Sequence, residues 1–232
     1  MARFGKAGFE IFTDIPRPPA ELIAKLAAFP PAILSDATGR RGSMHGTIRR
    51  LTPGLTLCGP ALTVEARPGD NLLMHAALAI AKPGDVLVVD GRGDMSCALA
   101  GGLMGRQAKL QGLAGWVVDG ALRDIDELAE IGLPAFARGS CPGGPDKEGP
   151  GRVGVTITCG GQVVEPGDII VGDADGVAVI PRAIAEAAVG LAEAKTAQEN
   201  ERRAEMEAGK MVPDWLMPLL RRFGGLKEGE SL

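Results

Sequence analysis

The stretch from Ala114 to Leu128 constrains the fold of this chain more than any other part of the sequence. Residues 114–119 are small and apolar and include two consecutive valines, a pattern typical of a strand that is covered on both faces. Asp119-Gly120 is a turn signal. The stretch therefore predicts a buried strand, a tight turn and the start of a new helix.

Arg123 and Asp124 lie at the predicted start of that helix. Asp124 and Glu127 have the spacing of an N-cap and its capping-box partner, which predicts a helix over residues 125–131 that ends at Gly132. A guanidinium next to a carboxylate at the end of a buried strand can bind a metal and an anionic substrate together. The alternative is that Asp124 only caps the helix and Arg123 lies in solvent.

A second stretch predicts a helix that opens at Gly101 and Gly102, because Leu103, Ala108 and Leu110 have helical spacing. A glycine-rich helix start exposes backbone N–H groups at the positive end of the helix dipole, where a carboxylate or a phosphate can bind. The pattern is neither G-x-G-x-x-G nor a P-loop. The alternative is a tight strand-to-helix connection without a ligand.

Two further polar residues are second-rank candidates for a site. His75 lies in a predicted helix over residues 72–81 between apolar neighbours, where a histidine is more often packed in the core than bound to a ligand. Asp36 would cap a short helix or line a pocket, and the cap is the commoner role.

Composition excludes several classes of function. Aromatic residues make up 3% of the 232 residues and tyrosine is absent, so the base-stacking platforms of single-stranded nucleic-acid binding proteins are not expected. The formal net charge is -4, and no basic cluster is longer than Arg40-Arg41 or Arg221-Arg222, which argues against a DNA or RNA partner. The apolar fraction of 45% is enough for a sizeable core of Ala, Val, Leu and Ile.

Cysteine spacing and hydropathy indicate the compartment. No CxxC motif is present, so a zinc ribbon or a thioredoxin-type site is not expected; the four cysteines are Cys58, Cys97, Cys141 and Cys159. The N-terminus lacks an apolar h-region, and no apolar run approaches the ~20 residues that cross a bilayer. We therefore expect a cytoplasmic protein with reduced thiols and no membrane contact.

Three regions are predicted along the chain. Residues 1–18 form an irregular N-terminal extension, and residues 19–190 form a single domain. Residues 191–232 form a helical arm and tail, because the predicted helix after Pro181 becomes highly charged and a short amphipathic segment around Trp215 follows it. We expect this arm to lie at a subunit interface.

Short elements separated by Gly and Pro are predicted for the rest of the domain. Gly59-Pro60 separates two of the predicted strands. The predicted elements are helices over 19–29 and 182–208, strands over 47–51, 55–58, 61–66, 133–138 and 177–180, and a hairpin of residues 153–158 and 162–164.

Taken together, these motifs resemble the family of divalent-metal-dependent pyruvate aldolases that includes 4-hydroxy-4-methyl-2-oxoglutarate / 4-carboxy-4-hydroxy-2-oxoadipate aldolase. The same superfamily contains the RraA regulators of ribonuclease E. The resemblance implies an α/β fold, a β/β/α swivelling-type sandwich that assembles as homotrimers, often paired into homohexamers, with active sites between subunits. It rests on Pro68-Gly-Asp-Asn71 with His75, Pro83-Gly-Asp-Val-Leu-Val-Val-Asp90, Gly101-x-Leu-Met, Gly115-x-Val-Val-Asp-Gly-x-x-Arg123-Asp124, and Pro166-Gly-Asp with Asp173-x-Asp-Gly176.

The resemblance also implies roles for individual residues. Asp124 would be the carboxylate ligand of Mg²⁺ or Mn²⁺. Arg123 would contact the C2 oxygen of a bound pyruvate unit. The backbone N–H groups of Leu103 and Met104, which follow Gly101, would hold the carboxylate of the substrate.

Two more positions concern the carboxylates around the metal. Glu199, in the charged C-terminal helix, would reach the metal-bound waters of the neighbouring subunit. Gly102 stands where the aldolases carry an acidic residue that bonds metal-bound water. Asp94 and Asp36 are the two candidates to supply the missing carboxylate.

The implied activity is that of a lyase that cleaves a 4-hydroxy-2-oxo dicarboxylate to pyruvate and a second oxo acid. Oxaloacetate decarboxylation is expected as well, because both reactions pass through the same enolate. The expected partner is a small 2-oxo acid. The alternatives are a non-catalytic, RraA-like regulator that binds a ribonuclease, and a metal enzyme of the same fold with a different 2-oxo acid reaction, which Gly102 would allow.

Overall fold

The structure is a computed structural model that describes residues 3–232 of the chain. Its contacts divide the chain into two compact units, Met1–Ala192 and Glu193–Leu232, and each is described by itself. Residues 1 and 2, which belong to the predicted N-terminal extension, lie outside the described residues.

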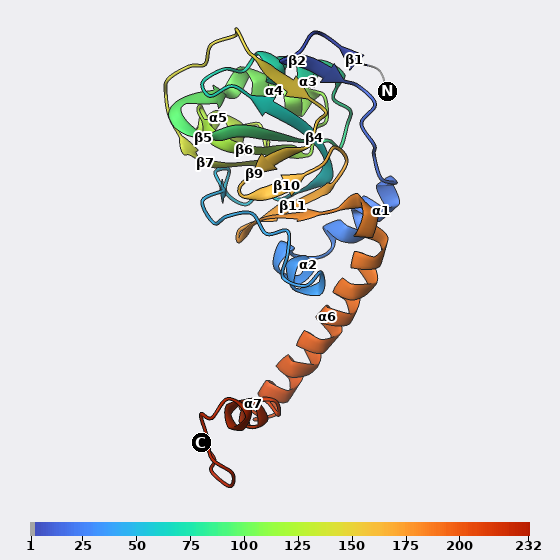
Figure 1. Cartoon of the computed structure of the whole chain (residues 1–232), viewed down its shortest axis with the longest axis vertical. Helices are drawn as coiled ribbons and strands as arrows, with labels where there is room; N and C mark the ends of the chain where they lie inside the picture. Colours follow the sequence, from blue (N-terminus) through green and yellow to red (C-terminus); the bar gives the residue numbers. More distant parts are fainter. Residues whose placement is uncertain (1–2) are drawn as a thin grey trace. The chain divides into compact units, whose positions relative to one another are not determined.

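The first unit is built on a mixed sheet with the strand order β1-β2-β8-β4-β5-β6-β7-β3 (Figure 1). Its central strands β4 to β7 run parallel, and β11 and β12 form a hairpin that pairs with the first half of β4. The strands are β1 (Arg3–Phe4), β2 (Phe9–Phe12), β3 (Arg49–Arg50), β4 (Leu57–Ala66), β5 (Val86–Ala100), β6 (Gly115–Leu122), β7 (Ala135–Ser140), β8 (Gly151–Val153), β9 (Ile157–Cys159), β10 (Gln162–Val164), β11 (Ile169–Asp173) and β12 (Gly176–Ile180).

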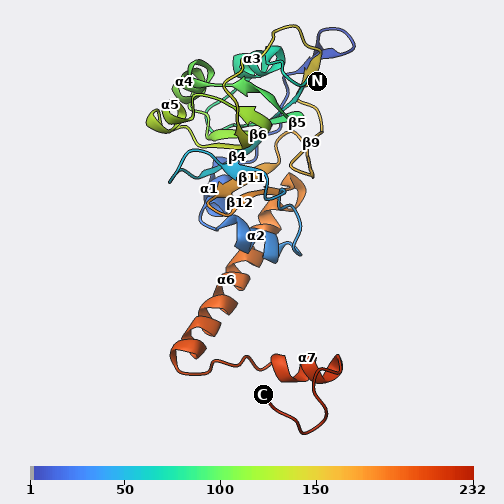
Figure 2. The same cartoon turned by 90° about the vertical axis from the view of Figure 1, so that its left-hand side faces the viewer.

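Helices cover the strands from two sides (Figures 1 and 2). The helices α3 (Leu72–Ile80), α4 (Gly102–Leu110) and α5 (Ile125–Glu130) connect the parallel strands and lie together on one side of them. On the other side, beyond β11, lie α1 (Ala20–Ala27) and α2 (Pro31–Ala37). The layers are therefore helices, sheet, a second set of strands, and helices.

Alternating side chains of the central strands feed two apolar clusters, because successive residues of a strand point to opposite faces. One cluster joins these strands to α3, α4 and α5, and its strand residues include Leu62, Val64, Leu87, Val89 and Trp116. The intervening positions pack against β9, β11 and β12 in a second cluster, which includes Ala61, Val86, Val88, Val117 and Phe136. A third cluster joins the β11–β12 hairpin to α1, α2 and the first residues of α6.

These layers confirm the predicted α/β class. The helices predicted over 72–81 and 125–131 are present as α3 and α5, and the helix that opens at the two glycines is α4. The predicted hairpin is present as β9 and β10, which pair antiparallel.

The predicted turn at Asp119-Gly120 is wrong, because both residues continue β6. The Asp119 side chain is buried, and its carboxylate accepts hydrogen bonds from the Arg138 guanidinium and from the N–H of Gly160 at 2.8 Å. Gly120 pairs with Asp94 at an irregularity of β5. Tertiary partners thus satisfy a carboxylate that sequence alone assigns to a turn.

Gly59-Pro60 is not a break either, because both residues lie inside β4. Pro60 pairs with Ile169 of β11, whereas the pairing of β4 with β5 begins one residue later, at Ala61. A proline, which has no N–H to donate, is tolerated where only one side of the strand is paired.

The prediction that residues 1–18 are irregular is wrong for Phe9–Phe12. These residues form β2 and pair in parallel with β8. Phe9 and Ile11 pack against the cluster of α3, α4 and α5, so burial of their side chains favours the strand.

The second unit holds most of α6 (Ala185–Glu207), which follows the short 3₁₀ helix Arg182–Ile184, and α7 (Leu216–Arg222). No residue from 193 to 232 is buried. Charged contacts hold the turn between the helices, because Arg202 donates to Glu205 at 2.9 Å and Lys210 donates to Asp214 at 2.6 Å. Within the described part of the chain, no helix combines the length and the apolar character needed to span a membrane.

Candidate active site

A cavity of about 240 Å³ lies beyond the carboxyl ends of β5 and β6, where α4 and α5 begin. This edge of a parallel sheet is where α/β proteins bind ligands, because loops and helix N-termini meet there. The cavity is lined by Asn71, His75, Ala100, Gly101, Leu103, Met104, Arg123, Asp124, Glu127, Pro145 and Lys147.

Asp124 occupies the N-cap position of α5, but its side chain does not cap that helix. Its backbone is left-handed (φ 56°, ψ 42°), and its Oδ2 accepts a hydrogen bond of 2.9 Å from the N–H of Gly102. The capping prediction is therefore wrong in its contact, because the carboxylate turns to the start of α4 instead. A non-glycine residue in this region of the Ramachandran plot is strained, and such strain is frequent at functional sites.

Gly101 lets Arg123 and Asp124 approach the end of β5. A Cβ at Gly101 would lie 2.4 Å from Oδ2 of Asp124 and 2.7 Å from Cγ of Arg123, so any other residue would displace both. The Arg123 guanidinium also lies against Gly144, where a Cβ would meet Nη1 at 2.8 Å. Nε of Arg123 is 3.6 Å from Oδ2 of Asp124, so the cation and the anion share one rim of the cavity.

Glu127 is the residue that sequence reasoning missed. Its carboxylate fills the space beside Gly102, where a Cβ would lie only 1.9 Å from Oε2. Its Oε1 accepts a hydrogen bond of 3.0 Å from Arg106, and no capping-box contact to Asp124 is found among residues 3–232. The spacing that suggested a capping box instead places a second carboxylate on the wall of the cavity that Asp124 lines.

Asp36 and Asp94 do not line this cavity. Asp36 lies on α2 and is 3.9 Å from Arg40, and Asp94 lies in β5, where it accepts a hydrogen bond from the hydroxyl of Ser96 at 2.8 Å. The carboxylate beside Gly102 is that of Glu127.

The start of α4 supplies free backbone donors. The N–H of Gly102 is used by Asp124, whereas the N–H groups of Leu103 and Met104 make no hydrogen bond within the described residues. These donors belong to the first turn of a helix, where no backbone carbonyl can satisfy them. An anionic group in the cavity can therefore accept hydrogen bonds from this turn.

The cavity is also lined by Asn71 and His75 of the α3 region and by Lys147 of a loop. The Asn71 side chain is buried, and its amide nitrogen is 3.3 Å from the sulfur of Met104, whereas Oδ1 has no hydrogen-bond partner among residues 3–232. Burial lowers the pKa of His75, and the nearby positive charge of Lys147 lowers it further. His75 lines the cavity and is only partly buried, so it is not packed in the core.

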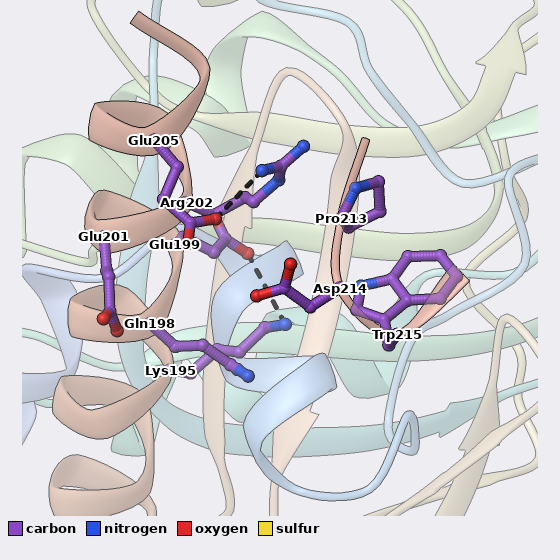
Figure 3. A pocket seen from close by; sticks show the side chains of 9 residues that line it. All are labelled: Lys195, Gln198, Glu199, Glu201, Arg202, Glu205, Pro213, Asp214 and Trp215. Atoms are coloured by element: carbon purple, nitrogen blue, oxygen red, sulfur yellow. Dashed lines mark hydrogen bonds and ion pairs between the residues drawn. The ribbon is translucent and has the colours of Figure 1, made fainter. Parts of the chain in front are cut away.

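Glu199, the remaining candidate, lies on α6 in the second unit. Within this chain its carboxylate pairs with Arg203 at 2.9 Å and with Lys195 at 3.7 Å. It lines a separate cavity of about 390 Å³, which Figure 3 shows together with Trp215.

The donors around the first cavity suit a hard divalent cation. No group of three or more His, Cys, Asp or Glu side chains gathers within residues 3–232, so an all-protein cage is not formed there. Mg²⁺ does not require one, because it keeps several waters and commonly binds through one or two carboxylates. The carboxylates of Asp124 and Glu127, which both line this cavity, fit that requirement.

Comparisons with known proteins show which family the chain is similar to. A protein of Halalkalibacterium halodurans named "Putative 4-hydroxy-4-methyl-2-oxoglutarate aldolase" is 41% identical over 192 residues, which cover 83% of this chain and 91% of that protein. A solved structure from Streptomyces coelicolor, RraAS2, described as an unusual member of the RNase ES inhibitor RraA protein family, matches with a TM-score of 0.71 and 31% identity over 83% of this chain and 98% of that chain. An uncharacterized protein from Pseudomonas syringae matches with a TM-score of 0.73 and 26% identity over 84% of this chain and 96% of that chain.

The family model described as "RraA-like: Aldolase/RraA" matches residues 31–179, which include every residue that lines the first cavity. This match also spans the strands from β3 to β11. The chain therefore belongs to the RraA-like family of aldolases and RraA proteins.

Proposed function

We propose that this protein is a divalent-metal-dependent lyase that cleaves a 4-hydroxy-2-oxo dicarboxylate to pyruvate and a second oxo acid, and that it decarboxylates oxaloacetate. The observation that carries the proposal is the convergence of two carboxylates, Asp124 and Glu127, with the guanidinium of Arg123 beside free helix N–H groups. The names of the aldolase relatives support the same reaction class.

Asp124 and Glu127 would hold Mg²⁺ or Mn²⁺. When bound, such an ion polarises the carbonyl of a 2-oxo acid as a Lewis acid. The free N–H groups of Leu103 and Met104 bind the C1 carboxylate, and Arg123 donates to the C2 oxygen. The substrate is thereby oriented with its C3–C4 bond toward the centre of the cavity.

The reaction breaks the C3–C4 bond and leaves its electron pair on the pyruvate fragment as an enolate. The C4 hydroxyl loses its proton and becomes the carbonyl of the second oxo acid, and C3 gains a proton to give pyruvate. Arg123 stabilises the negative charge that develops on the C2 oxygen, which is the largest contribution expected of a fixed cation in such a site. Glu127, the second carboxylate that lines the cavity, would accept and return the proton through water.

The same arrangement supports decarboxylation of oxaloacetate. In that reaction the C3–C4 bond breaks, its electron pair stays on the pyruvate fragment, and C4 leaves as CO₂, so no hydroxyl proton has to be removed. The enolate and its contacts with Arg123 are identical, so one site can serve both substrates.

A homotrimer or homohexamer is part of this proposal, with Glu199 of the partner subunit as a further carboxylate near the metal. The second unit supports it, because none of its residues is buried and it exposes Trp215, Met211 and Phe223. We further propose a cytoplasmic location, since all four cysteines are unpaired.

Pyruvate release tests the function directly. We expect release from 4-hydroxy-4-methyl-2-oxoglutarate and from oxaloacetate in the presence of Mg²⁺ or Mn²⁺, loss of both activities in EDTA, and recovery on return of the metal. The Asp124→Asn variant should be inactive, whereas Asp126→Asn, at an exposed position two residues further along α5, should keep the activity of the wild type. Activity that persists in EDTA or in Asp124→Asn would sink the mechanism.

The likeness to RraAS2 favours one second candidate, a regulator that binds a ribonuclease without turnover. It predicts a stable complex with a ribonuclease in gel filtration and no pyruvate release with any metal. The outcome of the EDTA experiment separates the two functions.

A further inference from the structure

We propose that Lys147 binds the second carboxylate of the substrate and so selects dicarboxylates over matched monocarboxylates. This inference rests on the proposed lyase function and assigns to Lys147 the recognition of the carboxylate at the far end of the substrate. Asp70 is the positioning residue that fixes the loop carrying Lys147.

The residues on both sides of Lys147 are tied to the segment that precedes α3. The N–H of Asp146 donates to the carbonyl of Gly69 at 2.8 Å, and the N–H of Asn71 donates to the carbonyl of Asp146 at 3.1 Å. On the other side of Lys147, two more backbone groups are held by Asp70. Its Oδ2 accepts hydrogen bonds from the N–H groups of Glu148 at 2.5 Å and Gly149 at 2.8 Å.

Asp70 is suited to this task because it is 2% exposed and its carboxylate accepts hydrogen bonds from the backbone N–H groups of Leu72, Glu148 and Gly149. Burial favours the neutral acid, but the backbone donors and the positive charge of Arg67 together outweigh it, so the pKa of Asp70 lies below its usual value. A buried carboxylate that accepts several N–H groups fixes the chain around it. The backbone of Lys147 is therefore held in place although its side chain is exposed.

Of the cationic side chains that line the cavity, one is available to bind the second carboxylate of the substrate. The cavity wall carries two permanent cations, Arg123 and Lys147. Arg123 lies 3.6 Å from Asp124 and serves the C2 oxygen. Among residues 3–232, no carboxylate forms an ion pair with Lys147, so its ammonium is available to a ligand.

Asn71 supplies a second, independent indication of a polar ligand at this wall. Its Oδ1 is buried without a hydrogen-bond partner, and an unpaired buried acceptor is costly. The 4-hydroxyl group of the proposed substrate is a donor that would satisfy it. A cavity of about 240 Å³ also suits a small acid rather than a larger ligand.

The test compares two substrates that differ only in the distal group, 4-hydroxy-2-oxoglutarate and 4-hydroxy-2-oxopentanoate. In Lys147→Met, we expect kcat/KM for the dicarboxylate to fall about 10- to 100-fold, mainly through KM, because a hydrogen bond to a charged group is lost. The value for the monocarboxylate should stay within about twofold of the wild type, since no charge contact is removed. Lys147→Arg should retain the preference, and Lys25→Met, an exposed lysine on α1 that pairs with Glu21, is the matched control.

A third measurement separates failure of this inference from failure of the proposed function. Exchange of the pyruvate methyl protons in D₂O requires the enolate but no distal carboxylate. Suppose that the wild type exchanges these protons. If Lys147→Met then lowers kcat/KM equally for both substrates, or for neither, the inference is overturned and the lyase function stands. If wild type neither exchanges the protons nor cleaves either substrate, the proposed function itself is overturned.

Discussion

The carboxylate of Glu127 occupies the volume that a side chain at Gly102 would need, because a Cβ at position 102 would lie 1.9 Å from Oε2 of Glu127. The first turn of α4 and the first turn of α5 thus share one site for an acidic group beside Asp124. In this chain α5 provides the acid, and the glycine on α4 makes room for it.

This relationship predicts that an acid can be moved between the two helices. Gly102→Asp alone should weaken Mn²⁺ binding and lower the melting temperature, because two carboxylates would crowd one space. The double variant Gly102→Asp/Glu127→Ala should recover binding. Isothermal titration with Mn²⁺ measures both effects, and additive losses in the double variant would refute the shared site.

The left-handed backbone of Asp124 predicts different outcomes for two substitutions that both remove its charge. Asparagine tolerates this conformation and can still accept a hydrogen bond from the N–H of Gly102. The free energy of unfolding of Asp124→Asn should therefore lie within about 1 kcal/mol of the wild-type value. Asp124→Ala should lose about 2 kcal/mol more, from backbone strain and the unpaired N–H. Both variants should lose metal binding. Urea unfolding gives the free energies of unfolding. Equal values for Asp124→Asn and Asp124→Ala would show that the backbone at position 124 is not strained.

Asp70 makes stability depend on pH in the acid range. Its pKa is lower in the folded than in the unfolded chain, where it is near 3.8, so it stabilises the fold fully above that value, and this stabilisation is lost as the pH falls through the lower, folded value. Asp70→Asn should therefore be destabilised by about 2 kcal/mol at pH 7 and converge with wild type at strongly acid pH. Chemical unfolding at a series of pH values checks this convergence. A gap between the two proteins that does not depend on pH would rule out the carboxylate as its source.

His75 reports on Lys147 without any substrate. The chain has only two histidines, so the variant His45→Gln identifies the signals of His75 in an NMR titration. Burial and Lys147 both lower its pKa, so Lys147→Met should raise the midpoint toward the usual value without reaching it. An unchanged midpoint would show that the ammonium lies away from the cavity.

A shared active site predicts complementation between inactive variants. Asp124→Asn and Glu199→Gln should each be impaired alone. In an equimolar mixture that is unfolded and reassembled, about a quarter of the sites would combine an intact Asp124 with an intact Glu199 of the partner subunit. Recovered activity in the mixture supports the shared site, whereas activity equal to the mean of the two variants speaks against it.

The sequence predicts this fold well where a single local signal, such as burial pattern or a helix-start motif, determines the element. Two-sided burial identifies β6 from residue 115, and the helix starts at Gly102 and Ile125 follow from glycine and capping signals. The turn prediction at Asp119 fails because Arg138 and Gly160, distant in sequence, satisfy its carboxylate inside the sheet.

The site is predicted in part for the same reason. Arg123, Asp124 and the helix start line one cavity, as neighbouring strand ends should. Glu127 was missed because its spacing from Asp124 also fits a capping box, and only the packing of α4 against α5 distinguishes the two. An acid three residues after Asp124, together with a glycine at 102, is the signal that identifies it.

The absence of any buried residue from 193 to 232 has a calorimetric consequence. The heat-capacity increment of unfolding comes mainly from apolar surface that becomes hydrated, at roughly 12–15 cal/mol/K per residue of a packed domain. The forty C-terminal positions add little such surface within one chain, so a dissociated protomer should show the increment of its first 192 residues. Any excess that appears on assembly would measure the apolar surface which this segment buries against other protomers.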